Sequence, residues 1–180
     1  WVINKKGEAA QIVEDIKNGE SVTREPKYEQ RAFVEGADDI GNTYIEIDYT
    51  NQHLWYYKDG SLVVDSDIVS GNLNNGNGSP DGVFKVISRQ SPATLKGEDY
   101  ESDVTYFMPF AYNVGLHDAS WRSSFGGSIY KNGGSHGCIN LPYDAADTIY
   151  KNVELGTPVV AYYREDVKLT SNNAKVSNAY

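Results

Sequence analysis

The chain has 180 residues, of which 39% are hydrophobic and 23% charged, a composition that supports a packed domain and excludes wholesale disorder. Its formal net charge of −9 argues against binding to nucleic acid and gives no support to binding anionic lipid. No apolar run reaches the roughly 18 residues that a membrane-spanning helix needs, and a single cysteine excludes an internal disulfide.

The first 41 residues predict one helix and little else. In GEAAQIVEDIKNGE (7–20), apolar residues recur at helical spacing, and Asn18-Gly19 marks a helix end. Residues 19–41 show no clear periodicity. A short helix and a loop cannot form a core alone, and the chain starts at Trp1 rather than Met. We therefore expect residues 1–40 to be the tail of an upstream domain or a linker, in a processed or shortened piece of a longer protein.

From Asn42 the pattern changes to short strands. Alternation in NTYIEIDYT (42–50) predicts a strand, and Asp59-Gly60 between two apolar runs predicts a hairpin. Further strands are expected over 83–88, 104–118 (one or two) and 156–163, a short helix over 142–153, and long loops over 72–82 and 91–102. The residues predict a mostly antiparallel β domain of about 120 residues.

The only cysteine, Cys138, lies in the glycine-rich run GGSHGCINL (133–141). A free cysteine is most often a small buried hydrophobe. Glycines, however, offer no side chains to bury a thiol, and they let consecutive N–H groups at Gly137 and Cys138 face one concavity, which suits a developing oxyanion. The sequence therefore favours a nucleophile at Cys138.

A thiol with an ordinary pKa of about 8.5 needs a base, and histidine is the usual one. His136 is two residues away, where contact is cramped. His117 ends a predicted strand and can meet the thiol from a separate element, so we favour it as the base. A third group must orient the imidazole. Either the side chain or the backbone carbonyl of Asp118 can do so.

HDASWRSSFGG (117–127) followed by SHGCINLP (135–142) resembles the catalytic signature of the L,D-transpeptidases of bacterial cell-wall synthesis, the YkuD-type domain. The segments SPDGVFKV (79–86), with Ser79 where threonine is usual, and GTPVVAYY (156–163) are also similar. The resemblance runs from about Asn42 to Tyr163. It implies a mainly β fold, a β-sandwich of mixed and antiparallel sheets with one or two short helices. The expected domains are 41–165 for catalysis and 166–180 as a C-terminal tail, with the end of a peptidoglycan-binding-type domain before them.

The resemblance also implies roles. Cys138 is the nucleophile, His117 its base, and the backbone carbonyl of Asp118 orients His117. The other implied site residues are Gly137 and Cys138 as oxyanion N–H donors, Ser135, His136 and Asn140 as lining residues, Trp121 on a flap over the cleft, and Tyr100 as an oxyanion hydroxyl, with Tyr106 and Tyr112 as competitors.

The activity implied by the family is acyl transfer between stem peptides of peptidoglycan. The thiolate attacks the carbonyl of the diamino acid at the third stem position, D-alanine leaves, and a neighbouring stem amine resolves the thioester into a 3→3 cross-link. Carbapenems are the expected covalent inhibitors, no cofactor is implied, and nucleic acid is not an expected partner. The implied location is extracellular, at a bacterial cell wall, with a membrane anchor or secretion in the full-length protein.

Three alternatives remain open at this stage. A hydrolase that trims stem peptides shares the first chemical step. Zinc bound by His117, His136 and Cys138 is a possible ligand set, although no typical metal-ligand spacing is present. A non-catalytic binding module could use tryptophan and tyrosine rings on a glycan. For Arg122 and Lys131, which flank the site, surface solvation is favoured over contact with substrate carboxylates.

Overall fold

The computed structural model describes residues 1–19, 21–97 and 100–169. They form two compact units, Trp1–Gly41 and a unit that begins at Asn42. That residues 1–40 end an upstream domain stays a prediction. Of the predicted tail over 166–180, residues 170–180 lie outside the described residues. Among the described helices, none is long and apolar enough to cross a membrane.

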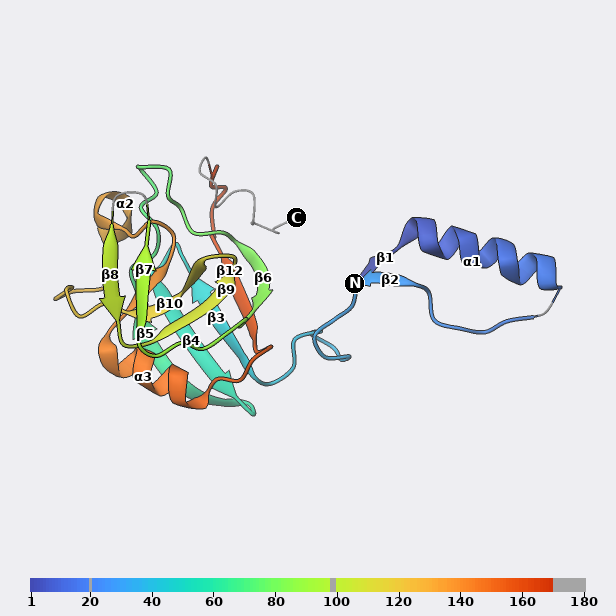
Figure 1. The fold of residues 1–180 in the computed structure, drawn as a ribbon, viewed down its shortest axis with the longest axis horizontal. Helices are drawn as coiled ribbons and strands as arrows, with labels where there is room; N and C mark the ends of the chain where they lie inside the picture. Colours follow the sequence, from blue (N-terminus) through green and yellow to red (C-terminus); the bar gives the residue numbers. More distant parts are fainter. Residues whose placement is uncertain (20, 98–99, 170–180) are drawn as a thin grey trace. The chain divides into compact units, whose positions relative to one another are not determined.

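The first unit contains the predicted helix (Figure 1). It consists of β1 (Val2–Ile3), α1 (Lys5–Asn18) and β2 (Tyr28–Gln30). The Asn4 side chain caps α1 by accepting a hydrogen bond from the Gly7 N–H at 2.8 Å. The helix ends at Gly19, whose φ of 68° is the left-handed conformation that glycine adopts freely. No residue of α1 is buried, and the segment after it contributes Arg24, which forms ion pairs with Glu8 and Asp15 at 3.0 Å.

The second unit is built mainly of strands. Its elements are β3 (Tyr44–Asp48), β4 (His53–Lys58), β5 (Ser61–Asp67), β6 (Gly82–Lys85), β7 (Ala93–Lys96), β8 (Glu101–Val104), β9 (Phe107–Ala111), β10 (Val114–Asp118), α2 (Ile129–Gly133), β11 (Ile139–Leu141), α3 (Tyr143–Asn152) and β12 (Pro158–Tyr162). The predicted hairpin at Asp59-Gly60 is confirmed, since Lys58 pairs with Ser61 across the β4–β5 turn.

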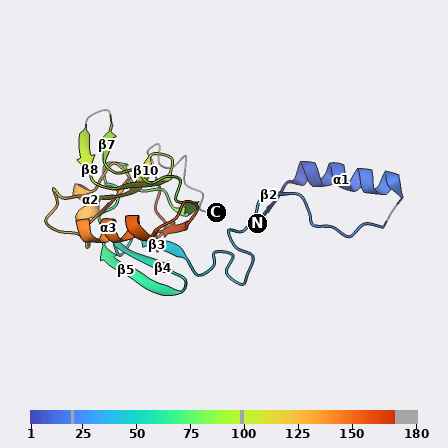
Figure 2. The ribbon, with the colours of Figure 1, turned by 60° about the horizontal axis from the view of Figure 1, so that its bottom comes forward.

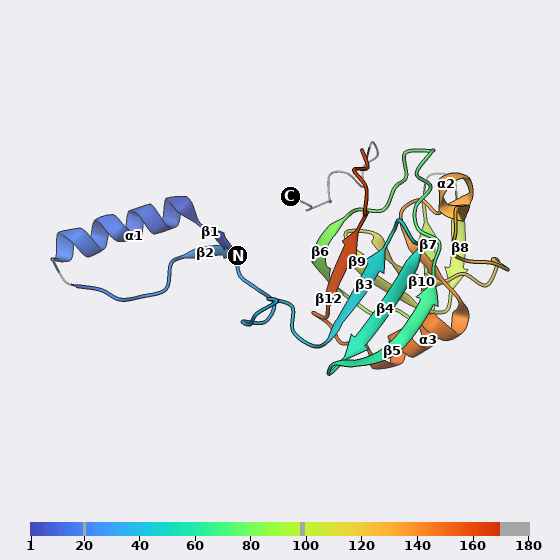
Figure 3. The same cartoon turned by 180° about the vertical axis from the view of Figure 1, so that it is seen from behind.

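Two mixed sheets make the body of this unit. One has the order β5-β4-β3-β12-β6, and Figure 3 shows it from its outer side. The other has the order β11-β10-β9. In each sheet one neighbouring pair is parallel, β3 with β12 and β10 with β11, and the remaining pairs are antiparallel. The predicted fold class, mainly β with mixed sheets and short helices, is confirmed.

The core lies between the sheets and under α3. Ile45 and Leu54 of the larger sheet, Leu116 of the smaller sheet and Ile149 of α3 are completely buried. The rings of Phe84 and Phe110 meet across the layers with centroids 5.6 Å apart. Burial of this apolar surface holds the sheets in place and fixes the positions of β10 and β11.

Residues 91–102 were expected to be a long loop, and this prediction was wrong. Residues 93–96 and 101–104 pair as the antiparallel strands β7 and β8, which project from the body (Figure 2). Polar cross-strand pairs support it: Thr94 Oγ1 donates to Asp103 at 2.8 Å, and Lys96 lies 3.1 Å from Glu101. Because these strands are partly solvated and carry polar side chains, their composition is that of a loop.

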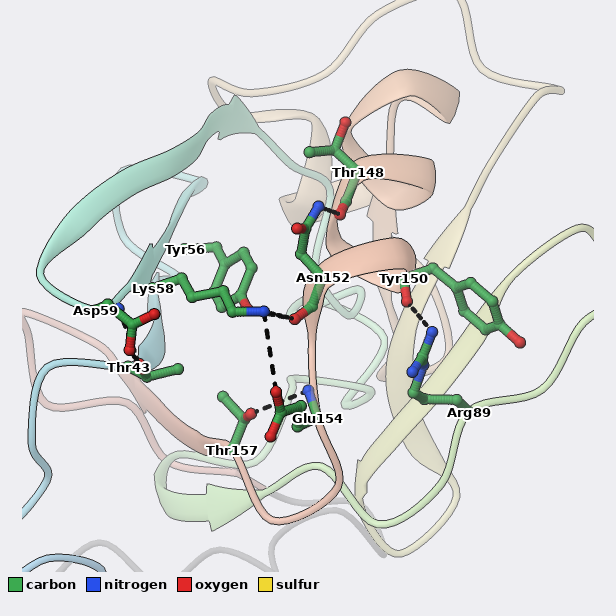
Figure 4. A network of polar contacts seen from close by, with 10 residues as sticks. All are labelled: Thr43, Tyr56, Lys58, Asp59, Arg89, Thr148, Tyr150, Asn152, Glu154 and Thr157. Atoms are coloured by element: carbon green, nitrogen blue, oxygen red, sulfur yellow. Dashed lines mark hydrogen bonds and ion pairs between the residues drawn. The ribbon is translucent and has the colours of Figure 1, made fainter.

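The helix α3 is fastened at its C-terminal end by side chains from β4 (Figure 4). Tyr56 Oη and Lys58 Nζ both donate to the Asn152 carbonyl, at 3.0 and 2.9 Å. Arg89 donates to the Tyr150 carbonyl. These donors satisfy terminal carbonyls that the helix itself leaves unpaired. Since α3 follows β11 after one residue, the contacts help to hold the strand next to Cys138.

Candidate active site

Two parallel strands bring the predicted base and nucleophile together. Leu116 pairs with Ile139 and His117 with Asn140, so Cys138, just before β11, comes alongside Gly115. All strand residues of β10 and β11 are buried, and His117 is only 3% exposed. The chain therefore places a histidine and a thiol, from separate elements, at one edge of a packed sheet.

A cavity of about 220 Å³ opens beside this pair. Its lining comes from three segments: His117, Trp121 and Arg122 from β10 and the turn after it; Gly134, Ser135, His136, Cys138 and Asn140 from the glycine-rich run; and Leu95, Tyr100 and Ser102 from the β7–β8 hairpin. Most of the side chains predicted for the site thus line one space.

The imidazole of His117 is held in one tautomer. Its Nδ1 lies 2.8 Å from the Asp118 carbonyl oxygen, and because a carbonyl only accepts, Nδ1 carries the hydrogen. Nε2 then has the free lone pair that a base requires. Burial lowers the pKa of His117, which keeps the ring neutral.

The structure also distinguishes the two possible contacts of Asp118. Its carboxylate accepts a hydrogen bond from the Tyr106 N–H at 2.7 Å, at the entry to β9. The imidazole is bound by the backbone carbonyl instead. The carboxylate therefore fixes the neighbouring strand, while the peptide unit orients the histidine.

The side chain of Cys138 is half-buried. Burial raises its pKa to about 11, against the smaller opposite effect of a hydrogen bond from the Gly115 backbone. Sγ donates to the Asn113 carbonyl at 3.6 Å rather than to His117. Proton transfer to Nε2 therefore requires the S–H to turn away from this carbonyl.

The backbone around Cys138 is tightly bent. Gly137 is buried with φ of 132°, a conformation that other residues rarely adopt. Ser135 Oγ accepts from the Gly137 N–H at 3.0 Å and donates to the Cys138 carbonyl at 2.5 Å. The Gly137 N–H, a predicted oxyanion donor, is thus engaged by Ser135 in this arrangement and would have to leave that partner to bind an oxyanion.

Ser79 is a supporting residue for which the sequence indicated no role. It is completely buried, and its Oγ accepts from the Gly71 N–H at 2.9 Å and donates to the Gly137 carbonyl at 2.6 Å. That carbonyl shares a peptide unit with the Cys138 N–H, and the two groups of a trans peptide point in opposite directions. Ser79 therefore fixes the direction of the Cys138 N–H. The one sequence signal was its place in the SPDG segment.

Of the three candidate tyrosines, only Tyr100 lines the cavity. Its ring stacks on His136 with centroids 4.5 Å apart. Tyr106 donates instead to Asp147 at 2.7 Å, and Tyr112 is 79% exposed.

Trp121 was expected on a flap over the cleft. It lies on the turn after β10 and lines the cavity, with its ring centroid 5.8 Å from that of His117. That this turn acts as a flap stays a prediction. Lys131 is on α2 and lines a different cavity. Within residues 1–19, 21–97 and 100–169, no three His, Cys, Asp or Glu side chains are grouped so that they could hold a metal ion.

Comparison with known proteins gives the same picture. Residues 42–160 match the family model of the L,D-transpeptidase catalytic domain, YkuD. A mutant of Enterococcus faecium L,D-transpeptidase is 40% identical with a TM-score of 0.73, over 89% of this chain and 65% of that one. The Ldtfm–avibactam carbamoyl enzyme is 41% identical with a TM-score of 0.72, over 89% and 64%.

The catalytic domain of the E. faecium enzyme acylated by ertapenem is 46% identical with a TM-score of 0.61, over 67% of this chain and 97% of that domain. The chain thus spans slightly less than two thirds of the longer Enterococcus structures. A comparison with curated proteins found no match.

Proposed function

This chain belongs to the L,D-transpeptidase catalytic-domain family, and from that premise we propose that it forms 3→3 cross-links between peptidoglycan stem peptides through a thioester on Cys138. The observation that carries the proposal is that a histidine and a thiol from separate segments line one cavity. His117 has its Nδ1 fixed by the Asp118 carbonyl and its Nε2 free, and the Cys138 thiol lines the same cavity.

The first half of the reaction acylates the enzyme. The Cys138 S–H turns towards His117, and Nε2 takes the proton from Sγ. The thiolate then adds to the carbonyl carbon of the diamino acid, and the negative charge on the carbonyl oxygen is bound by the Cys138 N–H, whose direction Ser79 fixes. When the C–N bond breaks, Nε2 returns the proton to the leaving D-alanine amine.

The second half transfers the acyl group. An amine of a neighbouring stem adds to the thioester, and Nε2 accepts a proton from that amine. The C–S bond then breaks, and Nε2 returns the proton to the departing Sγ, which regenerates the thiol. The pKa values suit this order of events. A buried neutral pair avoids isolated charge in the resting site, and charge develops only after substrate enters.

The relatives support covalent chemistry with β-lactam-type reagents. One similar structure is acylated by ertapenem and another is a carbamoyl enzyme formed with avibactam. For this chain, acylation of Cys138 by a carbapenem is a proposal. So is its location outside the cell, at the cell wall, which follows from the proposed substrate.

The test is intact-protein mass spectrometry after incubation with a carbapenem, beside the Cys138→Ala variant. The expected result is one adduct per chain, absent from the variant. Incubation with stem tetrapeptide should then give a cross-linked dimer with loss of D-alanine. An adduct that persists in Cys138→Ala overturns the nucleophile, and release of D-alanine without any dimer identifies a hydrolase.

A further inference from the structure

An unpaired arginine faces the active-site cavity. Arg122 lies on the turn after β10, where its N–H donates to the Ala119 carbonyl at 3.0 Å, and its side chain lines the cavity with His117 and Cys138. Its Nε is buried, and no described residue accepts a hydrogen bond from it. No carboxylate of the described residues pairs with its guanidinium.

Such an arrangement is costly for the protein alone. Arg122 as a whole is half-buried, but its Nε–H has lost contact with solvent without gaining an acceptor, and a buried donor is normally paired. Burial lowers the pKa of Arg122, and it is the sole cause of that shift, so no nearby acid compensates. The same cavity also contains the buried Asn140 Oδ1, which accepts from no described donor. An anionic group of a ligand can accept from the Arg122 Nε–H, whereas Asn140 Oδ1 needs an N–H or O–H donor, such as a peptide N–H of the same ligand.

We propose that Arg122 binds the C-terminal carboxylate of the amino acid that leaves the donor stem. The inference rests on the proposed function, because it takes a peptide carbonyl at Sγ as its reference point. The leaving residue's carboxylate is three bonds from that carbonyl carbon, which limits their separation to about 4 Å. A carboxylate so close to the reacting centre must enter the cavity that Arg122 lines.

The contact makes Arg122 a specificity-determining residue. A stem that ends one residue after the scissile bond presents a carboxylate to it. A stem extended by a further residue, or amidated at its terminus, presents a neutral group and leaves the guanidinium unpaired. The bound carboxylate also affects His117. Burial is the main cause that lowers the pKa of His117, and the positive charge of Arg122 lowers it further. A carboxylate bound to Arg122 offsets the effect of that charge.

The test measures binding without turnover. The full chain carrying Cys138→Ala is titrated with a stem peptide ending in lysyl-D-alanine and with the same peptide ending in lysyl-D-alaninamide. The acid should bind about 10- to 100-fold more tightly than the amide, as a charged hydrogen bond requires. Adding Arg122→Gln should remove this preference by weakening the acid alone. Adding Lys131→Gln, which removes a cation from a different cavity, should preserve it.

Equal affinity for acid and amide in the parent protein overturns the inference, as does a preference that survives Arg122→Gln. Those results leave the proposed function standing if the chain with Cys138 still releases D-alanine from the acid peptide. If neither peptide binds and none is turned over, the proposed function fails and the inference fails with it.

Discussion

The two walls of the active-site cavity are built in different ways. The strand wall, His117, Cys138 and Asn140, belongs to a sheet whose neighbouring Leu116 and Ile139 are completely buried. The hairpin wall, Leu95, Tyr100 and Ser102, belongs to the polar β7–β8 hairpin that projects from the body (Figure 2).

The difference shows which side chains of the cavity the fold holds rigidly in position. Core packing holds the proposed base and nucleophile, because a misplaced base or nucleophile lowers the reaction rate steeply. The opposite wall depends on one exposed ion pair, solvated backbone and one ring stack, which stabilise little and open readily. An extended peptide can enter from that side without disturbing the strand wall.

Replacing the base should have the largest effect. In His117→Gln the side chain can still hydrogen-bond but cannot take a proton, so acylation of Cys138 by a carbapenem should slow by about 10²- to 10⁴-fold. The rate is followed by intact mass. His136→Gln, which alters an exposed ring that stacks on Tyr100 of the hairpin wall, is the matched control and should lose far less. Similar losses of acylation rate in both variants would show that the two walls do not differ in their importance for the reaction.

Removing the Ser79 hydroxyl, which lies behind the strand wall, should have the second-largest effect on the acylation rate. Ser79→Ala leaves the Gly71 N–H and the Gly137 carbonyl without their partner. We expect acylation to slow by about 10- to 100-fold, less than direct loss of an oxyanion donor. The free energy of unfolding should fall by about 1–3 kcal/mol.

Ser79→Thr keeps the hydroxyl and should restore most of the acylation rate of Ser79→Ala. A variant that loses stability but acylates at the parent rate would show that Ser79 has a structural role only.

The pH dependence of alkylation at Cys138 tests whether burial in the strand wall raises the pKa of the thiol. Alkylation of Cys138 by iodoacetamide should rise with pH to a midpoint of about 11, because burial favours the neutral thiol. In urea the midpoint should return to about 8.5. The folded pKa is the higher one, so this group stabilises the fold below the unfolded pKa, and that contribution is lost as pH rises towards 11. A plateau below pH 9 would instead indicate a resting thiolate–imidazolium pair.

The smallest effect is expected from the hairpin's surface ion pair. Lys96 and Glu101 are both well exposed, so Lys96→Gln should change the free energy of unfolding by less than about 1 kcal/mol. Amide exchange over β7 and β8 should quicken while β10 stays protected. In contrast, Leu116→Ala on the strand wall should cost about 2–5 kcal/mol. Comparable losses in the two variants would mean that the hairpin is as firmly built as the core.

Much of the second unit was predictable because its signals are local. Alternation over 42–50 and the Asp59-Gly60 turn gave β3, β4 and their hairpin with β5, since strand periodicity and turn chemistry involve near neighbours. The helix over 142–153 followed from the same kind of pattern. The β7–β8 hairpin and the short helix α2 were missed because polar, half-exposed segments have loop composition.

By itself, the sequence determined the chemistry available to this protein. It has one thiol among glycines, one histidine at a strand end, and a signature that names the family. Only the tertiary structure decided how these groups are used. It paired the imidazole with a carbonyl rather than a carboxylate, set Ser79 behind the Gly137 peptide, and left Arg122 without an acid. Ser79 and Gly137 are far apart in sequence, and no local periodicity encodes a contact that forms only when two sheets close on a common core.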